Sequence, residues 1–264
     1  MKPAHMPSLY LPHGGGPSFF MEGERKQLYQ AMEDFLRGVP SLLPGVPTSI
    51  LIVTAHWETP VHRFTGAAQP ALIYDYFGFP LATYQISYEA PGHPELAAKA
   101  AGLLRAAGLE AQVDEHYGWD HGVFIPLKVI YPQASIPVVA MSLQSSLSPE
   151  LHCAAGQALR SLREAGVLII GSGMSYHNLR NFEEGASASF EFDGWLEQAL
   201  VGNASQRAAQ LARWSQAPGG RVSHPREEHL MPLMLASGAG SDRPGRRLWQ
   251  GLVGPTCASA WAFD

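Results

Sequence analysis

Apolar runs of two kinds alternate along the chain, and together they predict strands and helices in turn. Continuous apolar runs rich in β-branched residues are typical of strands buried on both faces. Such strands are predicted at 8–11, 48–54, 136–143 and 167–170. Helices are predicted at 27–36, 94–107, 149–165, 192–214 and 225–236, and an edge strand at 247–262. Since strands and helices alternate without a break in composition, residues 1–264 are expected to form a single α/β domain, three-layered around a central largely parallel or mixed sheet.

Four histidines lie in short, turn-rich motifs that are spread along the chain. His13 lies in LPHGGGP, His56 in TAHW and His177 in GMSYHNLR, each after a predicted strand. His229 lies in HPREEHLMPL, where a predicted helix begins. Because strand ends of an α/β sheet bring distant residues into one site, we expect these imidazoles to meet. Neutral imidazoles suit zinc, iron or copper better than calcium or magnesium, so the pattern predicts a mononuclear metal enzyme.

Taken singly, none of these motifs is specific. His13 could be a turn residue before three glycines, and His56 could be a hydrogen-bonded core histidine. The HGGG run also resembles an esterase oxyanion loop, but that function requires G-x-S-x-G, and GMSYH at 173–177 lacks the closing glycine. The segment around His229 is not H-E-x-x-H, so a zincin-like protease site is not supported. His62 and His152 are expected at the surface.

Composition and charge narrow the class of protein. With 264 residues, of which 46% are hydrophobic and 16% charged, the chain is typical of a globular domain. A net charge of −5 gives no basis for binding nucleic acid or an anionic membrane. No apolar run reaches the roughly 18 residues that span a bilayer, and no signal peptide is recognised. Cys153 and Cys257, outside any C-x-x-C pattern, are expected to be reduced thiols of a cytoplasmic protein.

Seven motifs carry a resemblance to a known family. They are LPHGGGP, TAHW, FGFP at 77–80, YEAPG at 88–92, GWDHG at 118–122, HNLR at 177–180 and EHLMPL at 228–233. In this order, over about residues 8–240, the chain resembles the class III extradiol dioxygenase superfamily, in its DOPA 4,5-dioxygenase-like branch. The resemblance implies a non-haem metal enzyme that opens a catechol ring with O2 to a semialdehyde. It implies His13, His56 and His229 as metal ligands, although a related branch has glutamate where His229 stands.

The resemblance leaves two roles open for His177, a catalytic base near the metal or a fourth metal ligand. A catechol and O2 together need about three of the six octahedral positions, which three protein ligands leave open and four do not. A tetrahedral four-histidine zinc site would be closed, like a structural one. We therefore predict Fe(II) for activity, with His177 as a base, and Zn(II) as an alternative bound metal, with His177 as a ligand.

The same resemblance implies roles for residues around the metal. His121 is expected to hydrogen-bond the oxygen species or to donate a proton, and Asp120 to orient an imidazole or contact the substrate. Trp57, Tyr76 and Phe77 are expected to wall the aromatic ring and exclude water.

Asp75 is a less specific polar candidate. An acidic substrate would need a cation, for which Arg180 and Arg226 are candidates unless they pair with Glu227 or Glu228.

Two other functions remain open from the residues alone. A zinc-dependent hydrolase or amidase could use the same scaffold, and oxygen consumption would discriminate it. A non-catalytic, zinc-stabilised binding protein would use four protein ligands and unfold on chelation. The expected partners are a small-molecule catechol and O2, with no nucleic acid and no membrane, and the aromatic loops are compatible with a homodimer.

Overall fold

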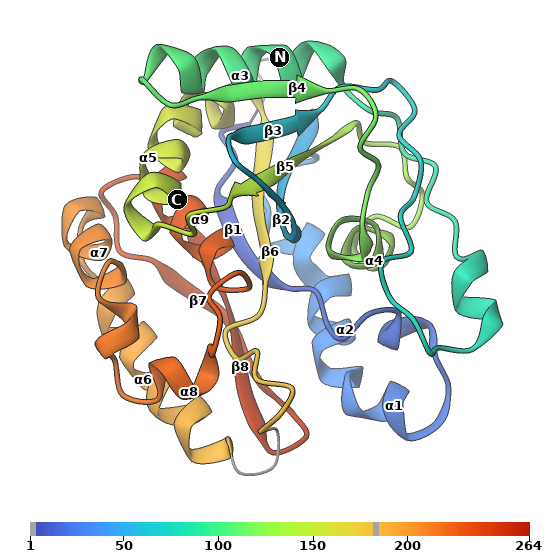
Figure 1. Ribbon diagram of the computed structural model, residues 1–264, viewed down its shortest axis with the longest axis vertical. Coiled ribbons are helices and arrows are strands. Elements are labelled where there is room, and N and C mark those ends of the chain that lie inside the picture. The colour runs from blue at the N-terminus through green and yellow to red at the C-terminus, as the bar shows by residue number, and fades with distance from the viewer. Residues whose placement is uncertain (1–3, 182–184) are drawn as a thin grey trace.

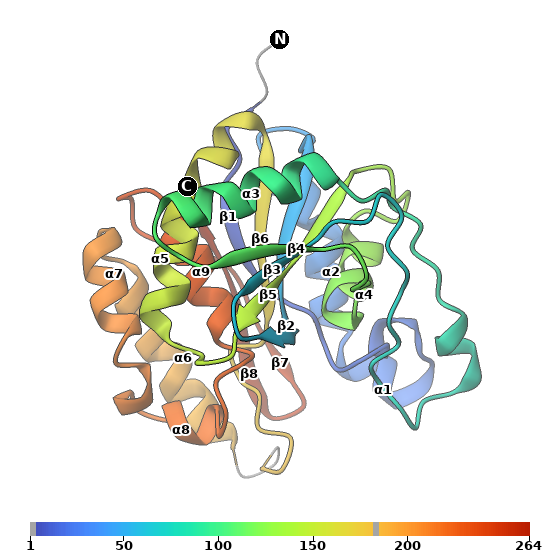
Figure 2. The same ribbon diagram turned by 45° about the horizontal axis from the view of Figure 1, so that its top comes forward.

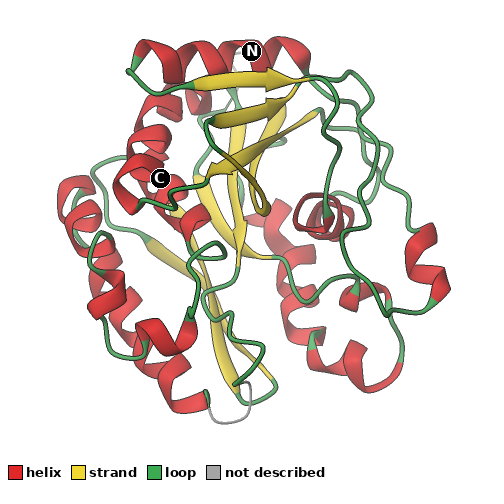
Figure 3. Cartoon of the chain, in the orientation of Figure 1, coloured by secondary structure: helices red, strands yellow, loops and turns green. Residues whose placement is uncertain are grey.

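The computed structural model describes residues 4–181 and 185–264, and these form a mixed sheet of eight strands with helices on both faces (Figures 1 and 3). The strands are β1 (Ser8–Pro12), β2 (Ser49–Thr59), β3 (His62–Thr65), β4 (Ala111–Asp114), β5 (Val138–Gln144), β6 (Val167–Gly173), β7 (Arg246–Val253) and β8 (Thr256–Phe263). Their order across the sheet is β4-β3-β5-β2-β6-β1-β8-β7. The predicted α/β class is confirmed, and the sheet is mixed.

The centre of the sheet is parallel and its two sides are not. β2 pairs in parallel with β5 and β6, and β6 pairs in parallel with β1. β8 runs antiparallel to β1 and forms a hairpin with β7. On the other side, β3 is antiparallel to β5 and parallel to β4. The stretch 247–262, predicted as one edge strand, therefore provides two strands, of which only β7 lies at the edge.

Helices cover both faces of this sheet. The α-helices of the described residues are α1 (Gly23–Leu28), α2 (Gln30–Gly38), α3 (Pro94–Ala106), α4 (His121–Ile130), α5 (Pro149–Leu159), α6 (Ala186–Leu200), α7 (Ala204–Leu211), α8 (Gly220–Ser223) and α9 (Met231–Ala239). Short 3₁₀ turns lie at Ser18–Phe20, Val39–Leu42, Leu81–Gln85, Arg160–Ala165 and Trp214–Gln216. The two ribbon views show α2 and α4 on one side of the sheet and α5, α6, α7 and α9 on the other (Figures 1 and 2).

The continuous apolar runs are explained by burial on both faces of the sheet. In β2, Leu51 and Val53 pack in the core formed with α3, α5 and α9, whereas Ile50 and Ile52 pack in the core formed with α2 and α4. Successive side chains of a strand point to opposite faces, so a strand between two cores must be apolar at every position.

The sequence pattern does not predict α4, β3 or β4. In α4 every residue but Lys128 is buried and Pro126 lies inside the helix, so the helix has no polar face and no 3.6-residue period. β3 and β4 are four residues each, too short to show an alternating pattern. The helix predicted at 225–236 begins only at Met231, which leaves His229 in the turn before it.

In the described ranges, no helix is both long and apolar enough to cross a membrane. Cys153 and Cys257 are free and buried, as expected.

His62 and His152, expected at the surface, are instead 2% and 0% exposed. The Nδ1 of His152 donates to the Ser148 carbonyl (2.7 Å), and its Nε2 accepts from the Gln144 backbone N–H (3.2 Å). Burial lowers the pKa of His152 to about 4, so this histidine is neutral at pH 7.

We predict that His152 makes the fold sensitive to mild acid. An unfolded histidine has a pKa of about 6.5, so below that pH the unfolded chain binds a proton that the folded chain takes up only near pH 4. The stability is therefore complete above about pH 6.5 and is lost as the pH falls. Between pH 7 and 5.5, His152→Gln should lose about 1 kcal/mol less unfolding free energy than the parent in urea titrations. The exposed His116→Gln is the control, and a parent-like pH slope in His152→Gln would contradict the prediction.

Candidate active site

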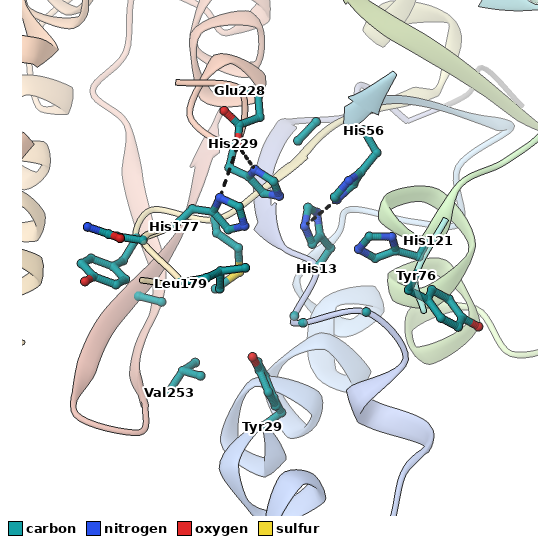
Figure 4. A pocket seen from close by; sticks show the side chains of 18 of the residues that line it. His13, Tyr29, His56, Tyr76, His121, His177, Leu179, Glu228, His229 and Val253 are labelled. Carbon is teal, nitrogen blue, oxygen red and sulfur yellow. Dashed lines mark hydrogen bonds and ion pairs between the residues drawn. The ribbon is translucent and has the colours of Figure 1, made fainter. Parts of the chain in front are cut away.

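Three histidines meet at the end of the parallel strands. His13 follows β1, His56 lies in β2 just past the last pairing of that strand with β6, and His229 lies in the turn before α9. Their ring centroids are 5.0 Å (His13–His56), 4.9 Å (His56–His229) and 5.1 Å (His13–His229) apart. The three imidazoles thus form a nearly equilateral triangle, to which β1, β2 and the α9 turn each contribute one (Figure 4).

Strand β6 lies between β1 and β2 and positions His13. The Ser172 hydroxyl donates to the Gly122 carbonyl, so its oxygen is left to accept from the Nδ1 of His13 at 3.0 Å. With its proton on Nδ1, His13 presents the lone pair of Nε2 to the other histidines. The main chain of His13 is also fixed, because its N–H donates to the Gly173 carbonyl (3.2 Å).

The same strand lets the main chain of His229 approach closely. A Cβ on Gly173 would lie 2.2 Å from the His229 carbonyl oxygen, so only glycine permits this contact. The carbonyl accepts hydrogen bonds from the Met174 N–H (3.1 Å) and from the buried Tyr10 hydroxyl (3.0 Å). The turn is therefore tied to β6 and β1 on both sides of the strand end.

Asp75 orients two imidazoles from the loop at 70–92. Its Oδ1 accepts from the backbone N–H (2.8 Å) and the Nδ1 (2.9 Å) of His121, the first residue of α4. Its Oδ2 lies 3.6 Å from the Nδ1 of His56. Gly122 is needed here, because a Cβ at that position would lie 2.9 Å from the His56 ring. Asp75, a minor candidate from sequence, is thus the carboxylate that contacts the imidazoles.

Glu228 orients a second pair of imidazoles. Its Oε1 lies 2.9 Å from the Nδ1 of His229 and 3.3 Å from the Nδ1 of His177. Burial alone would raise the pKa of Glu228, but hydrogen bonds from the two histidines hold it well below its usual range. The carboxylate therefore stays ionised. The rings of His177 and His229 stack in parallel, with their centroids 3.3 Å apart and an interplanar angle of 17°.

The cluster has the chemistry of a metal site. The Nε2 atoms of His13 and His56 face each other at 3.3 Å, while their Nδ1 atoms are directed to Ser172 and Asp75. Burial and then the neighbouring imidazoles hold the pKa of both histidines well below the usual range, and burial lowers the pKa of His229 to about 4. Neutral imidazoles with converging lone pairs are the form that binds a transition metal.

Two tight groups of candidate ligands lie side by side in the described residues. The ligand atoms of His13, His56 and His121 lie within 4.8 Å of one another, and so do those of His177, Glu228 and His229. A single metal held about 2.1 Å from three ring nitrogens places the ring centres at nearly equal separations of about 5 Å. The triangle of His13, His56 and His229 has this shape, whereas His121 lies 4.0 Å from His56 and 5.6 Å from His13.

A cavity of about 540 Å³ adjoins the cluster. Tyr76, Phe77, His121 and His177, all predicted from the sequence, line it. Trp57 and Asp120 were also predicted to contact the substrate. They are not among the described residues that line the cavity.

Trp57 and Asp120 instead make contacts with other residues of the protein. Trp57 stacks on Tyr117 with ring centroids 3.9 Å apart. Asp120, fully buried, accepts from the Thr54 hydroxyl (2.7 Å). Burial and then the charge of Asp75 raise the pKa of Asp120 to about 6.

The two arginines considered for an acidic substrate are placed differently. Arg226 lines the cavity but pairs with Glu58 (2.5 Å) and Glu228 (3.3 Å). Arg180 is exposed and lies outside the described lining.

Sequence reasoning missed the roles of Ser172 and Glu228. The G-S-G sequence at the end of a buried strand is a signal for Ser172, but only the turn geometry brings Glu228 to both histidines.

Comparison with known proteins agrees with this geometry. Residues 1–253 match the family described as the catalytic LigB subunit of aromatic ring-opening dioxygenase. The chain belongs to this family. Family members are metal-dependent enzymes that take O2 and a small aromatic molecule, and the prediction of an extradiol ring-opening dioxygenase is confirmed.

Curated relatives and a solved structure cover nearly the whole chain. The 4,5-DOPA dioxygenase extradiol of Mirabilis jalapa is 36% identical over 248 residues, 92% of this chain and 90% of that protein. Dioxygenase tasH of Hapsidospora irregularis is 39% identical over 254 residues, 88% of this chain and 78% of that protein. The crystal structure of an uncharacterized protein from Escherichia coli K12 has a TM-score of 0.75 and 27% identity, over 98% of this chain and 100% of that chain.

We predict that Asp75, and not Asp120, controls metal affinity. Loss of a carboxylate that orients ligand imidazoles typically lowers metal affinity by about 10- to 100-fold, and Asp75→Asn should do so in chelator-competition titrations. Asp120→Asn should leave affinity nearly unchanged, because its carboxylate is bonded to Thr54 rather than to an imidazole. The reverse order of the two variants would contradict this assignment.

Proposed function

We propose that this protein is a non-haem Fe(II) extradiol dioxygenase that opens the ring of a catechol related to DOPA. The single observation that supports it best is the equilateral cluster of neutral His13, His56 and His229 beside a cavity with aromatic walls. The names of the curated relatives point to DOPA-like substrates. In the overall reaction, the ring bond beside the diol breaks, and both atoms of O2 enter the product, one in a carboxylate and one in an aldehyde.

His13, His56 and His229 would hold the metal in this proposal. When bound, the metal supplies a common anchoring point for the two catechol oxygens and for O2, and withdraws electron density from the diol. The neutral state of all three imidazoles suits a divalent cation, and the adjoining cavity provides room for a substrate on one side of the cluster. A closed structural zinc site would not need such a cavity.

His177 is proposed as the base that takes a proton from the catechol. Its Nδ1 is directed to Glu228, so in the neutral ring the proton lies on Nδ1 and Nε2 can accept one. Because its ring stacks on that of His229 with an interplanar angle of 17°, the lone pairs of the two rings lie in nearly parallel planes and do not converge on one nearby point. Since His229 completes the triangle with His13 and His56, this favours His229 as a ligand and His177 as a proton acceptor.

His121 is a further polar residue of the cavity wall. Asp75 accepts from its Nδ1, so its Nε2 is the atom left to hold or move a proton at the wall. Tyr76 is nearly buried, and its hydroxyl donates to the Thr83 carbonyl (2.6 Å), so this ring serves as a fixed apolar surface. Phe77 is 90% exposed at the edge of the cavity, where it can cover a bound ring.

The activity is tested by oxygen uptake. We expect the metal-free protein, reloaded with Fe(II) under anaerobic conditions, to consume O2 with a panel of catechols and to form a yellow ring-opened product, and the Zn(II)-loaded protein to do neither. His56→Ala should abolish the uptake, because a ligand is lost. No uptake with any catechol, together with tight zinc binding, would overturn the proposal and favour a zinc hydrolase or a structural zinc site.

The role of His177 is tested by separating metal binding from rate. His177→Gln should retain the metal but lower kcat by about 10²- to 10⁴-fold, the usual contribution of a general base. His229→Gln should instead lose metal, measured by metal content after dialysis against a weak chelator. His116→Gln, on the surface, is the matched control. Equal loss of metal from His177→Gln and His229→Gln would show that His177 is a ligand.

A further inference from the structure

Arg25, in α1, is a cation of the cavity wall that has no acidic partner among the described residues. Among the described residues that line the cavity, positive side chains come from Arg25 and Arg226. Arg226 is neutralised by Glu58 and Glu228. By contrast, no carboxylate in the described chain lies within 4.0 Å of the Arg25 guanidinium. The wall that holds Glu58, Arg226 and Glu228 thus carries a net negative charge, and the wall that holds Arg25 carries a positive one.

Two contacts hold Arg25 beside the glycine loop that follows His13. Its Nε donates to the Ser18 hydroxyl (3.4 Å), and that hydroxyl donates to the Gly15 carbonyl. Its Cζ lies 4.9 Å from the centre of the Phe79 ring, which also lines the cavity. Among the described residues these contacts use only Nε and one face of the guanidinium, so the two terminal nitrogens remain available for a planar anion such as a carboxylate.

Tyr29 provides a second donor at the same wall. Tyr29 is 7% exposed. Its hydroxyl oxygen packs closely against Gly15, since a Cβ on that glycine would lie 2.5 Å from it. Its hydroxyl is directed toward His13 in Figure 4. Burial raises the pKa of Tyr29 in spite of the opposing effect of Arg25, so the hydroxyl keeps its proton and can donate.

We propose that Arg25 and the Tyr29 hydroxyl bind the carboxylate of a catechol that carries its acid group on a short side arm. This inference rests on the proposed function, because it requires the diol to lie at the histidine cluster. The carboxylates of Glu58 and Glu228, which also line the cavity, repel a carboxylate, so the acid is directed to Arg25. Met174 and Val253 also line the cavity and suit an apolar arm. Neither Arg180 nor Arg226 is needed for this recognition.

The test compares an acid with its neutral analogue in two independent measurements. The probes are 3-(3,4-dihydroxyphenyl)propionate and its methyl ester. Their kcat/KM values are measured by oxygen uptake, and their Kd values by anaerobic calorimetry on the metal-loaded protein. Arg25→Gln should reduce the preference for the acid about fivefold to tenfold, through KM and Kd rather than kcat, as expected for a partly solvated ion pair. Arg25→Lys should keep part of the preference, and Tyr29→Phe should reduce it by a smaller factor.

Arg180→Gln is the matched control, because this exposed arginine lies outside the described lining. A ratio of acid to ester that is the same in the parent and in Arg25→Gln, in either measurement, would overturn the inference. Loss of the preference in Arg180→Gln instead would show that Arg180, and not Arg25, binds the carboxylate. If the parent cleaves no catechol of the panel, the proposed function fails, whereas the calorimetric comparison of the two probes still decides whether Arg25 binds the carboxylate.

Discussion

The close packing of the chain at 229–232 against β6 is the constraint on which the site depends. A Cβ on Gly171 would lie 2.2 Å from the Pro232 carbonyl oxygen, and one on Gly173 equally close to that of His229. Because the two main chains touch directly, the side chain of His229 reaches the ends of β1 and β2. Side chains on the strand would separate these backbones and move His229 away from His13 and His56.

Each of the three central imidazoles is oriented from its Nδ1 side by a different group. The Ser172 hydroxyl contacts His13, Asp75 faces His56, and Glu228 contacts His229. These groups come from a strand, a long loop and a turn, and all three direct Nε2 inward. Because these buried imidazoles are neutral, they repel one another only weakly. Their Nε2 lone pairs can serve as ligands to a divalent cation.

Charged and apolar side chains are unevenly distributed around the cavity. Ionised Glu228 and the Glu58–Arg226 pair lie on one wall, and Arg25 lies near the glycine loop. Exposed Phe77 and Leu179 lie at its edge, at 90% and 74% exposure. The site therefore combines a polar end, which has the chemistry of a metal site, with an apolar edge. This arrangement is typical of an enzyme for small aromatic molecules and unlike a closed structural zinc site.

The sequence by itself determined the α/β class, the four central strands, and the motifs that carry His13, His56, His121, His177 and His229, because buried strands and glycine-rich turns leave local patterns. It did not predict α4, whose uniformly apolar surface has no helical period, nor the short β3 and β4. Only the tertiary structure decided that Asp75 rather than Asp120 contacts the imidazoles, and that Glu228 joins His177 to His229. It also decided that Arg25 lines the cavity without a carboxylate partner in the part of the chain that the structure describes. Such pairings depend on where distant loops meet in space, and no local pattern in the chain records that position.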